Sequence, residues 1–170
     1  MLYGPEQAAK HEKVLSGLAR RKYDVFVDIG CGDGVLLSKV QFGSSLQVGL
    51  DLSPGMLAKA RDVLEGRGNL VRADAGHLPL RDGVVDCVVS ISLSESENIE
   101  ALASEIARIA REDATILLSV IHPYGASLPN FAGLKLLDTA LFSPRETLFV
   151  LAKCGRPMLK NEWRGIDEGR

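Results

Sequence analysis

The sequence predicts an α/β fold with a doubly wound, mostly parallel sheet, and two observations carry this prediction. Short apolar runs of strand length alternate along the chain with longer segments whose apolar residues have helical spacing. Such alternation is typical of parallel sheets, because each parallel connection has to cross a face of the sheet. Glycines or carboxylates also follow the first three runs, at the sheet edge where ligands bind in this fold class.

The elements follow from apolar spacing and from helix start signals. Apolar residues between Glu6 and Leu18 have helical spacing and predict a first helix, at about 5–19, ahead of the sheet. Ser53 and Pro54 predict the start of a later helix, because serine caps helix N-termini and proline suits the first helical position. The strands are expected at about 24–29, 46–51, 69–72, 84–92 and 115–121, and the intervening helices at about 34–41, 54–65 and 98–111.

The chain departs from simple alternation after the fifth strand. Residues 124–132 contain glycine, proline and several small side chains, which is too broken a pattern for a long helix. Residues 134–141 and 147–154 then predict two strands joined by residues 142–146. We therefore expect a seven-stranded sheet with an antiparallel C-terminal strand, shortened between strands five and six by a loop in place of a crossover helix.

Length and composition indicate one globular domain, at 1–155, followed by a polar tail at 156–170. Apolar residues make up 46% of the 170 residues and charged residues 25%, which is ordinary for globular proteins. The sequence has no apolar run as long as a membrane span and no signal-peptide pattern. The net charge of −2 means that the chain has no excess of positive charge for tight, unaided binding of nucleic acid, although a local basic patch is compatible with it.

The cysteines and histidines do not predict a metal site. Cys31, Cys87 and Cys154 are odd in number, and no spacing between them suits a metal. The three histidines likewise form no ligand pattern. Free thiols are the best account of the cysteines, and they indicate a reducing, cytoplasmic location.

The most informative motif is a glycine turn after the first predicted strand. Asp28 precedes Gly30, Gly32 and Gly34, and a helical segment begins at Val35. Glycine permits positive φ and lets a ligand lie against bare main chain, and the dipole of the following helix points into the same turn. The pattern predicts a nucleotide site; a tight turn without chemical meaning is the alternative.

The spacing of the glycines separates two classes of nucleotide. A dinucleotide fingerprint requires G-x-G-x-x-G. Here the third glycine comes one residue early, and Val35 stands where that glycine belongs. The carboxylate of Asp28 would also repel a phosphate, whereas it suits a cation. A nicotinamide-dependent oxidoreductase is therefore disfavoured.

A second carboxylate, Asp51, ends the next predicted strand, 23 residues after Asp28. An acid at that distance in a β-α-β unit reaches the ribose of a nucleotide bound at the first turn. A carboxylate accepts hydrogen bonds from both ribose hydroxyls, which favours an unphosphorylated ribose. A surface acid that caps a loop is the alternative.

Together these motifs resemble those of the class I S-adenosylmethionine-dependent methyltransferases, over about residues 24–122. The first family motif is an acid followed by G-x-G-x-G, as at 28–34. The string Asp-Leu-Ser-Pro-Gly-Met-Leu at 51–57 is similar to the second motif almost letter for letter, and residues 69–80 resemble the third. The resemblance implies a Rossmann-like sheet and S-adenosyl-L-methionine as the cofactor.

The resemblance also implies roles for single residues. Asp28 would lie near the methionyl ammonium group, Asp51 on the ribose and Asp74 on the adenine amino group. Asp86, just before the fourth strand, is expected to orient that strand rather than to act chemically. The expected cofactor-binding set is Asp28, Gly30, Cys31, Gly32, Gly34, Asp51, Leu52, Asp74, Ala75 and Ser90.

Methyl transfer from a sulfonium needs donor and acceptor in line and away from bulk water, and it needs a base only if the acceptor must lose a proton. The catalytic candidates are Ser92, near the end of strand four, and His122 and Tyr124, at the end of strand five. Histidine titrates near neutral pH and can serve as a base. A structural histidine ahead of a proline turn is an equally good interpretation of His122.

The acceptor stays open between a small molecule and an RNA or translation component. The motifs at 51–57 and 78–80 look most like those of small-molecule methylators, whereas residues 87–92 are faintly similar to ribosomal RNA guanine-N7 methyltransferases. Because those enzymes can depend on a small zinc-binding subunit, a small activator is among the expected partners. The alternative to an enzyme is a non-catalytic scaffold or regulatory subunit that binds S-adenosylmethionine.

Overall fold

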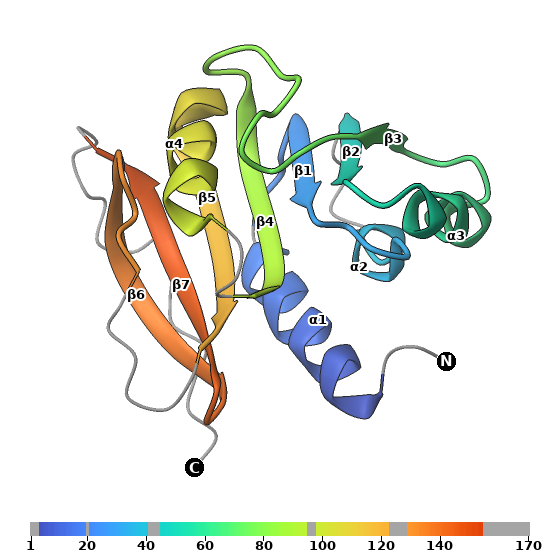
Figure 1. The fold of residues 1–170 in the computed structure, drawn as a ribbon, viewed down its shortest axis with the longest axis horizontal. Helices are drawn as coiled ribbons and strands as arrows, with labels where there is room; N and C mark the ends of the chain where they lie inside the picture. The colour runs from blue at the N-terminus through green and yellow to red at the C-terminus, as the bar shows by residue number, and fades with distance from the viewer. Residues whose placement is uncertain (1–3, 20, 41–44, 95–97, 123–128, 155–170) are drawn as a thin grey trace.

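The computed structural model describes residues 4–19, 21–40, 45–94, 98–122 and 129–154. Its centre is a seven-stranded sheet with the strand order β3-β2-β1-β4-β5-β7-β6 (Figure 1). The strands are β1 (Val25–Ile29), β2 (Leu46–Asp51), β3 (Asn69–Arg72), β4 (Val85–Ser94), β5 (Ala110–Ile121), β6 (Leu134–Ser143) and β7 (Glu146–Lys153). The helices are α1 (Pro5–Leu18), α2 (Val35–Ser38), α3 (Pro54–Leu64) and α4 (Ile99–Ile109).

The pairing of the strands confirms the predicted sheet. β1 pairs in parallel with β2 and β4, and the parallel pairs β2–β3 and β4–β5 extend the sheet on both sides. β7 is antiparallel both to β5 and to the edge strand β6. The strands β1 to β5 therefore all end at one edge, where a doubly wound sheet binds its ligands.

Helices cover both faces of the sheet, and alternate strand residues face different helices. On one face, Phe26 of β1 and Leu117 of β5 share a buried cluster with Val14 of α1. On the other face, Val27 of β1 shares a buried cluster with Ile106 of α4. These side chains are completely buried, and each contributes roughly 1.5–3 kcal/mol to stability. Packing thus fixes α1 on the sheet, beside the carboxyl end of β4 (Figure 1).

Helix α2 is shorter than expected, at Val35–Ser38 instead of 34–41. Ser38 Oγ donates a hydrogen bond to the carbonyl of Val35 (2.9 Å). The backbone N–H groups of Lys39 and Val40 bond to carbonyls three residues earlier (3.1 and 3.2 Å). Side-chain bonding to the local backbone and tightening to i−3 bonds both favour the end of a helix.

Strand β5 begins earlier than expected, at Ala110 instead of residue 115. Ala110 ends α4 in an extended conformation (φ −70°, ψ 139°) and already pairs with Val85 of β4. Helix and strand therefore join without a loop. The charged residues 111–113, which favour a turn in the sequence, lie instead in the irregular start of the strand, where the register with β4 shifts.

The connection between β5 and β6 agrees with the sequence prediction as far as it is described. Residues 122 and 129–133 form no helix, and residues 123–128 lie outside the described residues. β6 and β7 form an antiparallel hairpin. The predicted tail at 156–170 also lies outside the described residues. In the described part of the chain, no helix has the length and apolar character needed to cross a membrane.

Candidate functional site

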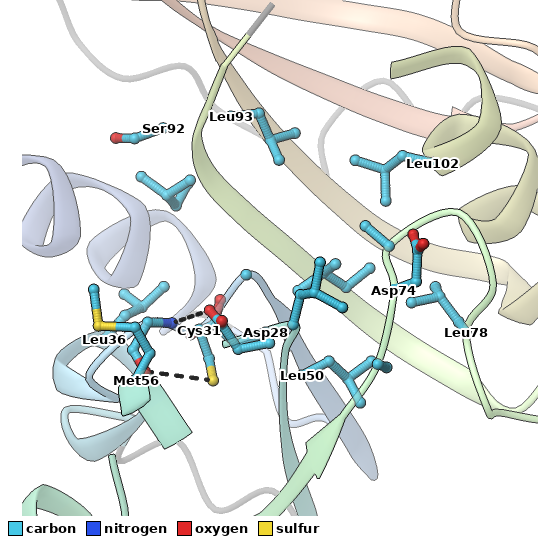
Figure 2. A pocket seen from close by; sticks show the side chains of 18 of the residues that line it. Asp28, Cys31, Leu36, Leu50, Met56, Asp74, Leu78, Ser92, Leu93 and Leu102 are labelled. Carbon is cyan, nitrogen blue, oxygen red and sulfur yellow. Dashed lines mark hydrogen bonds between the residues drawn. The ribbon is translucent and has the colours of Figure 1, made fainter. Parts of the chain in front are cut away.

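A pocket of about 830 Å³ lies at the carboxyl edge of the parallel strands. Its walls are the ends of β1, β2 and β4, the loop after β3, and parts of α1 and α4. Figure 2 shows Asp28 and Asp74 on different sides of the pocket, with Ser92 and Leu93 at the end of β4. The volume falls in the range typical of sites for nucleotide-sized ligands.

The glycine turn forms the part of the wall that follows β1. Gly30, Gly32 and Gly34 all have positive φ (72°, 55° and 77°). The N–H groups of Gly30 and Cys31 donate to the carbonyl of Leu50 (2.7 and 3.0 Å), which ties the turn to the end of β2. Gly30, Cys31 and Gly32 line the pocket, so bare main chain is presented to a ligand as expected.

Gly34 has a different role from the expected cofactor contact. It lies outside the pocket lining, and a Cβ added to it would come within 3.0 Å of Ala60 Cβ and 3.1 Å of Ala60 Cα. Ala60 belongs to α3 and is completely buried. The third glycine therefore lets the start of α2 approach α3 closely, which is a packing requirement.

Asp28 is the most unusual polar group of the pocket. Its side chain is only 2% exposed, yet it lines the cavity, and its Oδ2 atom has no hydrogen-bond partner among the described residues. Burial, and to a lesser extent the nearby charge of Asp51, raises the pKa of Asp28 to about 7. A buried, unpaired carboxylate is costly. A cation bound beside Asp28 would remove this cost, which is the fit expected for the ammonium group of S-adenosylmethionine.

Asp51 organises the next part of the wall. Its Oδ2 accepts a hydrogen bond from the N–H of Gly32 (2.9 Å), and its Oδ1 accepts one from the N–H of Ser53 (2.8 Å). Each carboxylate oxygen can accept a second bond, so the half-buried Asp51 keeps capacity for a ligand hydroxyl. Ser53 in turn caps α3, accepting from the N–H of Met56 (3.3 Å), as the sequence predicted.

The loop after β3 forms the wall on the side away from α1. Asp74 and Ala75 line the pocket, and Asp74 Oδ1 accepts from the N–H of Gly76 (2.8 Å) in a local turn. Leu52, which is 60% exposed, and Leu78, which is 5% exposed, line the same cavity. The expected adenine-binding residues therefore come together.

Two residues of α4 that the sequence analysis missed hold this loop. Glu105 Oε2 accepts from the N–H of Leu78 (2.7 Å), and Arg108 donates to the carbonyls of Leu78 (2.9 Å) and Leu80 (2.8 Å). The hydrogen bond from Arg108 lowers the pKa of Glu105 despite some burial. Their i, i+3 spacing is a sequence signal of a helix ion pair, but the loop that they bind is not evident from it.

Ser90 does not take the predicted place at the pocket. Its side chain is completely buried, its Oγ donates to the carbonyl of Ile29 (2.6 Å), and it lies outside the lining. Beyond Ser90, the register of β4 with β5 shifts before Leu93. The lining residues are instead Ile91, Ser92 and Leu93.

The buried hydroxyl of Ser90 leads to a stability prediction. Replacing Ser90 by alanine leaves the carbonyl of Ile29 without its side-chain donor, and we expect the free energy of unfolding to fall by about 1–3 kcal/mol. Urea denaturation of the wild type and of Ser90→Ala at one pH measures the difference. A loss below about 0.5 kcal/mol would show that this bond is dispensable.

A buried polar network that the sequence did not reveal lies behind Ser92. Glu146, which is 2% exposed, accepts hydrogen bonds from Ser92 Oγ (2.9 Å) and Ser119 Oγ (2.7 Å) and pairs with Lys10 of α1. Burial alone would lower the pKa of Lys10, but its bonds with Glu146 and Glu6 outweigh this and raise it. In this network Lys10 and Glu146 both stay charged although they are buried, and their contacts join α1 to β4, β5 and β7.

Of the other two catalytic candidates, the structure describes His122, which is less well placed than Ser92. His122 lies outside the lining, and its Nε2 is 2.9 Å from Thr147 Oγ1, an arrangement that fits the structural interpretation. Tyr124 lies outside the described residues. His11 of α1, which the sequence analysis did not select, does line the pocket, and burial followed by the charge of Lys39 lowers its pKa.

Asp86 makes structural hydrogen bonds, but with the start of β1 instead of the strand β4 that it was expected to orient. Asp86 accepts hydrogen bonds from the N–H groups of Asp24 (2.7 Å) and Val25 (2.9 Å) at the start of β1, away from the pocket. Cys31 and Cys87 are free, buried thiols whose pKa is raised, chiefly by burial. No group of three or more candidate metal ligands occurs in the described part of the chain.

Comparison with known proteins gives relatives of two kinds. A segment of 87 residues is 36% identical to the 18S rRNA (guanine-N(7))-methyltransferase bud23 of Schizosaccharomyces pombe and covers 51% of this chain and 32% of that protein. A segment of 119 residues is 36% identical to the malonyl-[acyl-carrier protein] O-methyltransferase of Geobacter sulfurreducens and covers 65% of this chain and 44% of that protein. The match thus spans less than half the length of either relative.

Solved structures share the fold. A chain in the complex between the Haloferax volcanii Trm112 methyltransferase activator and a methyltransferase superposes with a TM-score of 0.72 at 18% identity, covering 90% of this chain and 94% of that one. The model of a methyltransferase domain family matches residues 27–118, more than half of the 170 residues. The chain therefore belongs to this family, that of the class I S-adenosylmethionine-dependent methyltransferases.

Proposed function

We propose that the chain transfers a methyl group from S-adenosyl-L-methionine to an acceptor. The observation that carries this proposal is Asp28, a carboxylate at the pocket wall that is 2% exposed and has one oxygen without a partner among the described residues. A ligand that places a cation beside this oxygen converts an unfavourable buried charge into a favourable pair. S-adenosylmethionine carries an ammonium and a sulfonium, and a phosphate ligand would meet repulsion instead.

The order of the strands supports one orientation of this ligand. The sheet runs β3-β2-β1-β4, so the acids that follow β3, β2 and β1 lie in a row along the pocket. In this proposal Asp74, Ala75 and Leu52 hold the adenine, Asp51 the ribose, and Asp28 with Gly30, Cys31 and Gly32 the amino-acid part. The ends of β4 and β5 then remain for the acceptor; of the two catalytic candidates that the structure describes, Ser92 and His122, Ser92 lines the pocket.

For methyl transfer from a sulfonium, the main task of the protein is to position the methyl donor and the acceptor. The bound sulfonium supplies an activated methyl group and a neutral leaving group. Asp28 and Asp51 fix the donor, while apolar side chains such as Leu93 and Leu102 keep water from the cavity. Ser92, at the end of β4, would contact the acceptor or the methyl group.

The relatives, the shared fold and the cysteines support further proposals for the acceptor, the partner and the location of the protein. The relatives are named for acting on 18S rRNA and on malonyl-[acyl-carrier protein]. Both an RNA and a small molecule, free or attached to a carrier protein, are therefore candidate acceptors. The fold shared with a chain of the Trm112 activator complex supports a small activator subunit as a partner. The free thiols support a cytoplasmic location.

Two measurements test the proposed function. Calorimetry should detect S-adenosylmethionine binding to the wild type, with loss of binding in Asp28→Asn and retention in Asp86→Asn, which changes a buried acid outside the pocket. Transfer of a radiolabelled methyl group to fractionated RNA, protein and small molecules should identify the acceptor. Binding without transfer to any fraction, with and without added cell extract, would favour a non-catalytic scaffold, and absence of binding would refute the proposal.

Arg108 gives a prediction for the adenine end of the pocket. Replacing Arg108 by methionine removes the donors to the carbonyls of Leu78 and Leu80, so the loop that would cover the adenine loses its attachment to α4. We expect about a tenfold loss of affinity for S-adenosylmethionine, or about 1.4 kcal/mol. Arg111→Met, which removes the ion pairs with Asp24 and Asp86 outside the pocket, is the matched control in the same calorimetric titration. Equal affinities of both variants would contradict the prediction.

A further inference from the structure

The wall at the end of β4 has an irregular backbone. Successive side chains of a strand normally point to opposite faces, but Ile91, Ser92 and Leu93 all line the pocket. Ser92 has φ 63°, in the left-handed region that few residues other than glycine adopt, and the register with β5 shifts around it. Ile91 packs against the cluster of Phe26 and Leu93 belongs to the cluster of Val27 on the other face, so the pocket wall crosses the sheet at Ser92. Something must hold this non-glycine residue in an unfavourable conformation.

The buried network behind the wall accounts for this conformation. The N–H of Ser92 donates to Ser119 Oγ (2.7 Å), and both hydroxyls donate to Glu146 Oε1 (2.9 and 2.7 Å). The side chain of Ser92 therefore bonds directly to the carboxylate of Glu146, and its main-chain N–H is linked to the same carboxylate through Ser119 Oγ. Because Glu146 is 2% exposed, water does not compete for these bonds.

Helix α1 completes the network from the other side. Lys10, which is 6% exposed, pairs with Glu146 Oε2 and supplies the charge that a buried carboxylate requires. Three residues earlier, Gln7 Nε2 donates to Ser92 Oγ (3.2 Å), and Gln7 also lines the pocket. The position of α1 and the backbone of Ser92 are thus linked through the same carboxylate.

We propose that Glu146 and Lys10 are positioning residues for methyl transfer, which act by holding Ser92 in its left-handed conformation and so shape the acceptor side of the pocket. The inference rests on the proposed function, because only a donor oriented along the β3-β2-β1 row leaves this wall to the acceptor. Neither residue lines the pocket, so their effect has to pass through Ser92 and Gln7. The acids that would bind the donor are not part of the network, and binding and transfer should therefore respond differently.

The test replaces the pair by apolar side chains of similar size. In Lys10→Met/Glu146→Leu no buried charge stays unpaired, because Glu6, the other partner of Lys10, is exposed to solvent; buried ion pairs often tolerate such a change. We expect affinity for S-adenosylhomocysteine to stay within about twofold of the wild type, while the methyl-transfer rate to the labelled fraction falls roughly 10- to 100-fold, as for a misplaced reacting group. Asp86→Asn, another buried acid that contacts no pocket residue, should leave both quantities unchanged.

A readout that needs no acceptor is the NMR signal of S-adenosylmethionine labelled with ¹³C in the transferred methyl group. Bound to the double variant, this methyl should give a chemical shift different from that in the wild type, whereas Asp86→Asn should reproduce the wild-type shift. An unchanged signal and an unchanged transfer rate in the double variant would overturn the inference. Failure of the wild type to bind either ligand would instead refute the proposed function.

Rescue distinguishes positioning from a general loss of structure. Glycine adopts φ 63° without strain, so adding Ser92→Gly to the double variant should bring the methyl shift back towards the wild-type value. The transfer rate is not part of this rescue, because Ser92→Gly also removes the hydroxyl of the catalytic candidate. A merely destabilised protein would not recover through a further glycine in a strand, which lowers stability. Absence of any rescue would show that Glu146 and Lys10 do not act through the backbone of Ser92.

Discussion

Replacing Asp28 by asparagine is expected to weaken S-adenosylmethionine binding about 30- to 150-fold, because the variant keeps the shape of the side chain but loses the charge opposite the ligand. The expected cost is about 2–3 kcal/mol, the low end of the range for truncating one partner of a buried charge pair. Calorimetry at pH 7.0 measures it. Asp86→Asn controls for the loss of a buried acid, and equal affinities of Asp28→Asn and wild type would contradict the assignment of Asp28 to the cationic end of the ligand.

The same carboxyl should make binding pH-dependent. Its pKa is about 7 in the free protein, raised first by burial and then by Asp51, so below pH 7 a proton has to leave before the cation binds. Affinity should therefore rise roughly fivefold from pH 6 to pH 7 and then level off. The protons released should appear as a buffer-dependent binding enthalpy that Asp28→Asn lacks. His11 also faces the pocket, but its pKa is lowered, and its contribution persists in that variant.

The stability of the ligand-free protein should fall as the pH rises, whereas the affinity for S-adenosylmethionine rises. An acid whose pKa is raised on folding contributes stability that is present at low pH and lost as pH rises through the folded pKa, here about 7. Without ligand, Asp28→Asn should therefore unfold at a higher temperature than the wild type at pH 8, and the difference should shrink towards pH 5. A variant that is weaker in binding but more stable is characteristic of a site residue.

Replacing Gly34 by alanine is expected to lower the free energy of unfolding by about 2–4 kcal/mol, from backbone strain and overpacking together. The new Cβ would lie 3.1 Å from Ala60 Cα, at φ 77°, and backbone atoms of α3 cannot move aside without shifting the helix. Urea denaturation measures the loss.

Gly83→Ala is the matched control for this prediction. Gly83 also has positive φ (62°), but a Cβ there would meet no atom within 4 Å. It should therefore show the cost of the backbone conformation alone, about 1–2 kcal/mol. If the two variants lose equal stability, close packing of α2 against α3 is not what requires glycine at position 34.

The parts of the fold and site that the sequence predicted are those with local signals. Asp28, the glycine turn and Asp51 are each a strand end followed by turn residues, and the structure brings them to one pocket. Ser90, by contrast, lies outside the pocket lining, next to the shift in the β4–β5 register that no local signal in the sequence indicates. A shift of this kind depends on Ser119 and Glu146, which lie 27 and 54 residues from Ser92 along the chain.

The ion pair between Lys10 and Glu146 could not be predicted from the sequence either, because it too depends on contacts between distant segments of the chain. A lysine within an amphipathic helix and a glutamate in a hairpin turn are each ordinary surface residues by sequence. Only the packing of α1 against the sheet and the antiparallel entry of β7 beside β5 bury them together. Neither event leaves a pattern within a window of ten or twenty residues.

The separation of Lys10 and Glu146, 136 residues apart, has a consequence for the order of events during synthesis. The donor-side turns, with the helix that holds the loop after β3, are complete once α4 has left the ribosome, but the wall at the end of β4 has to wait for the final hairpin. Contacts this distant form late and slowly. A nascent chain should therefore gain affinity for the nucleoside well before it gains the ability to act on anything.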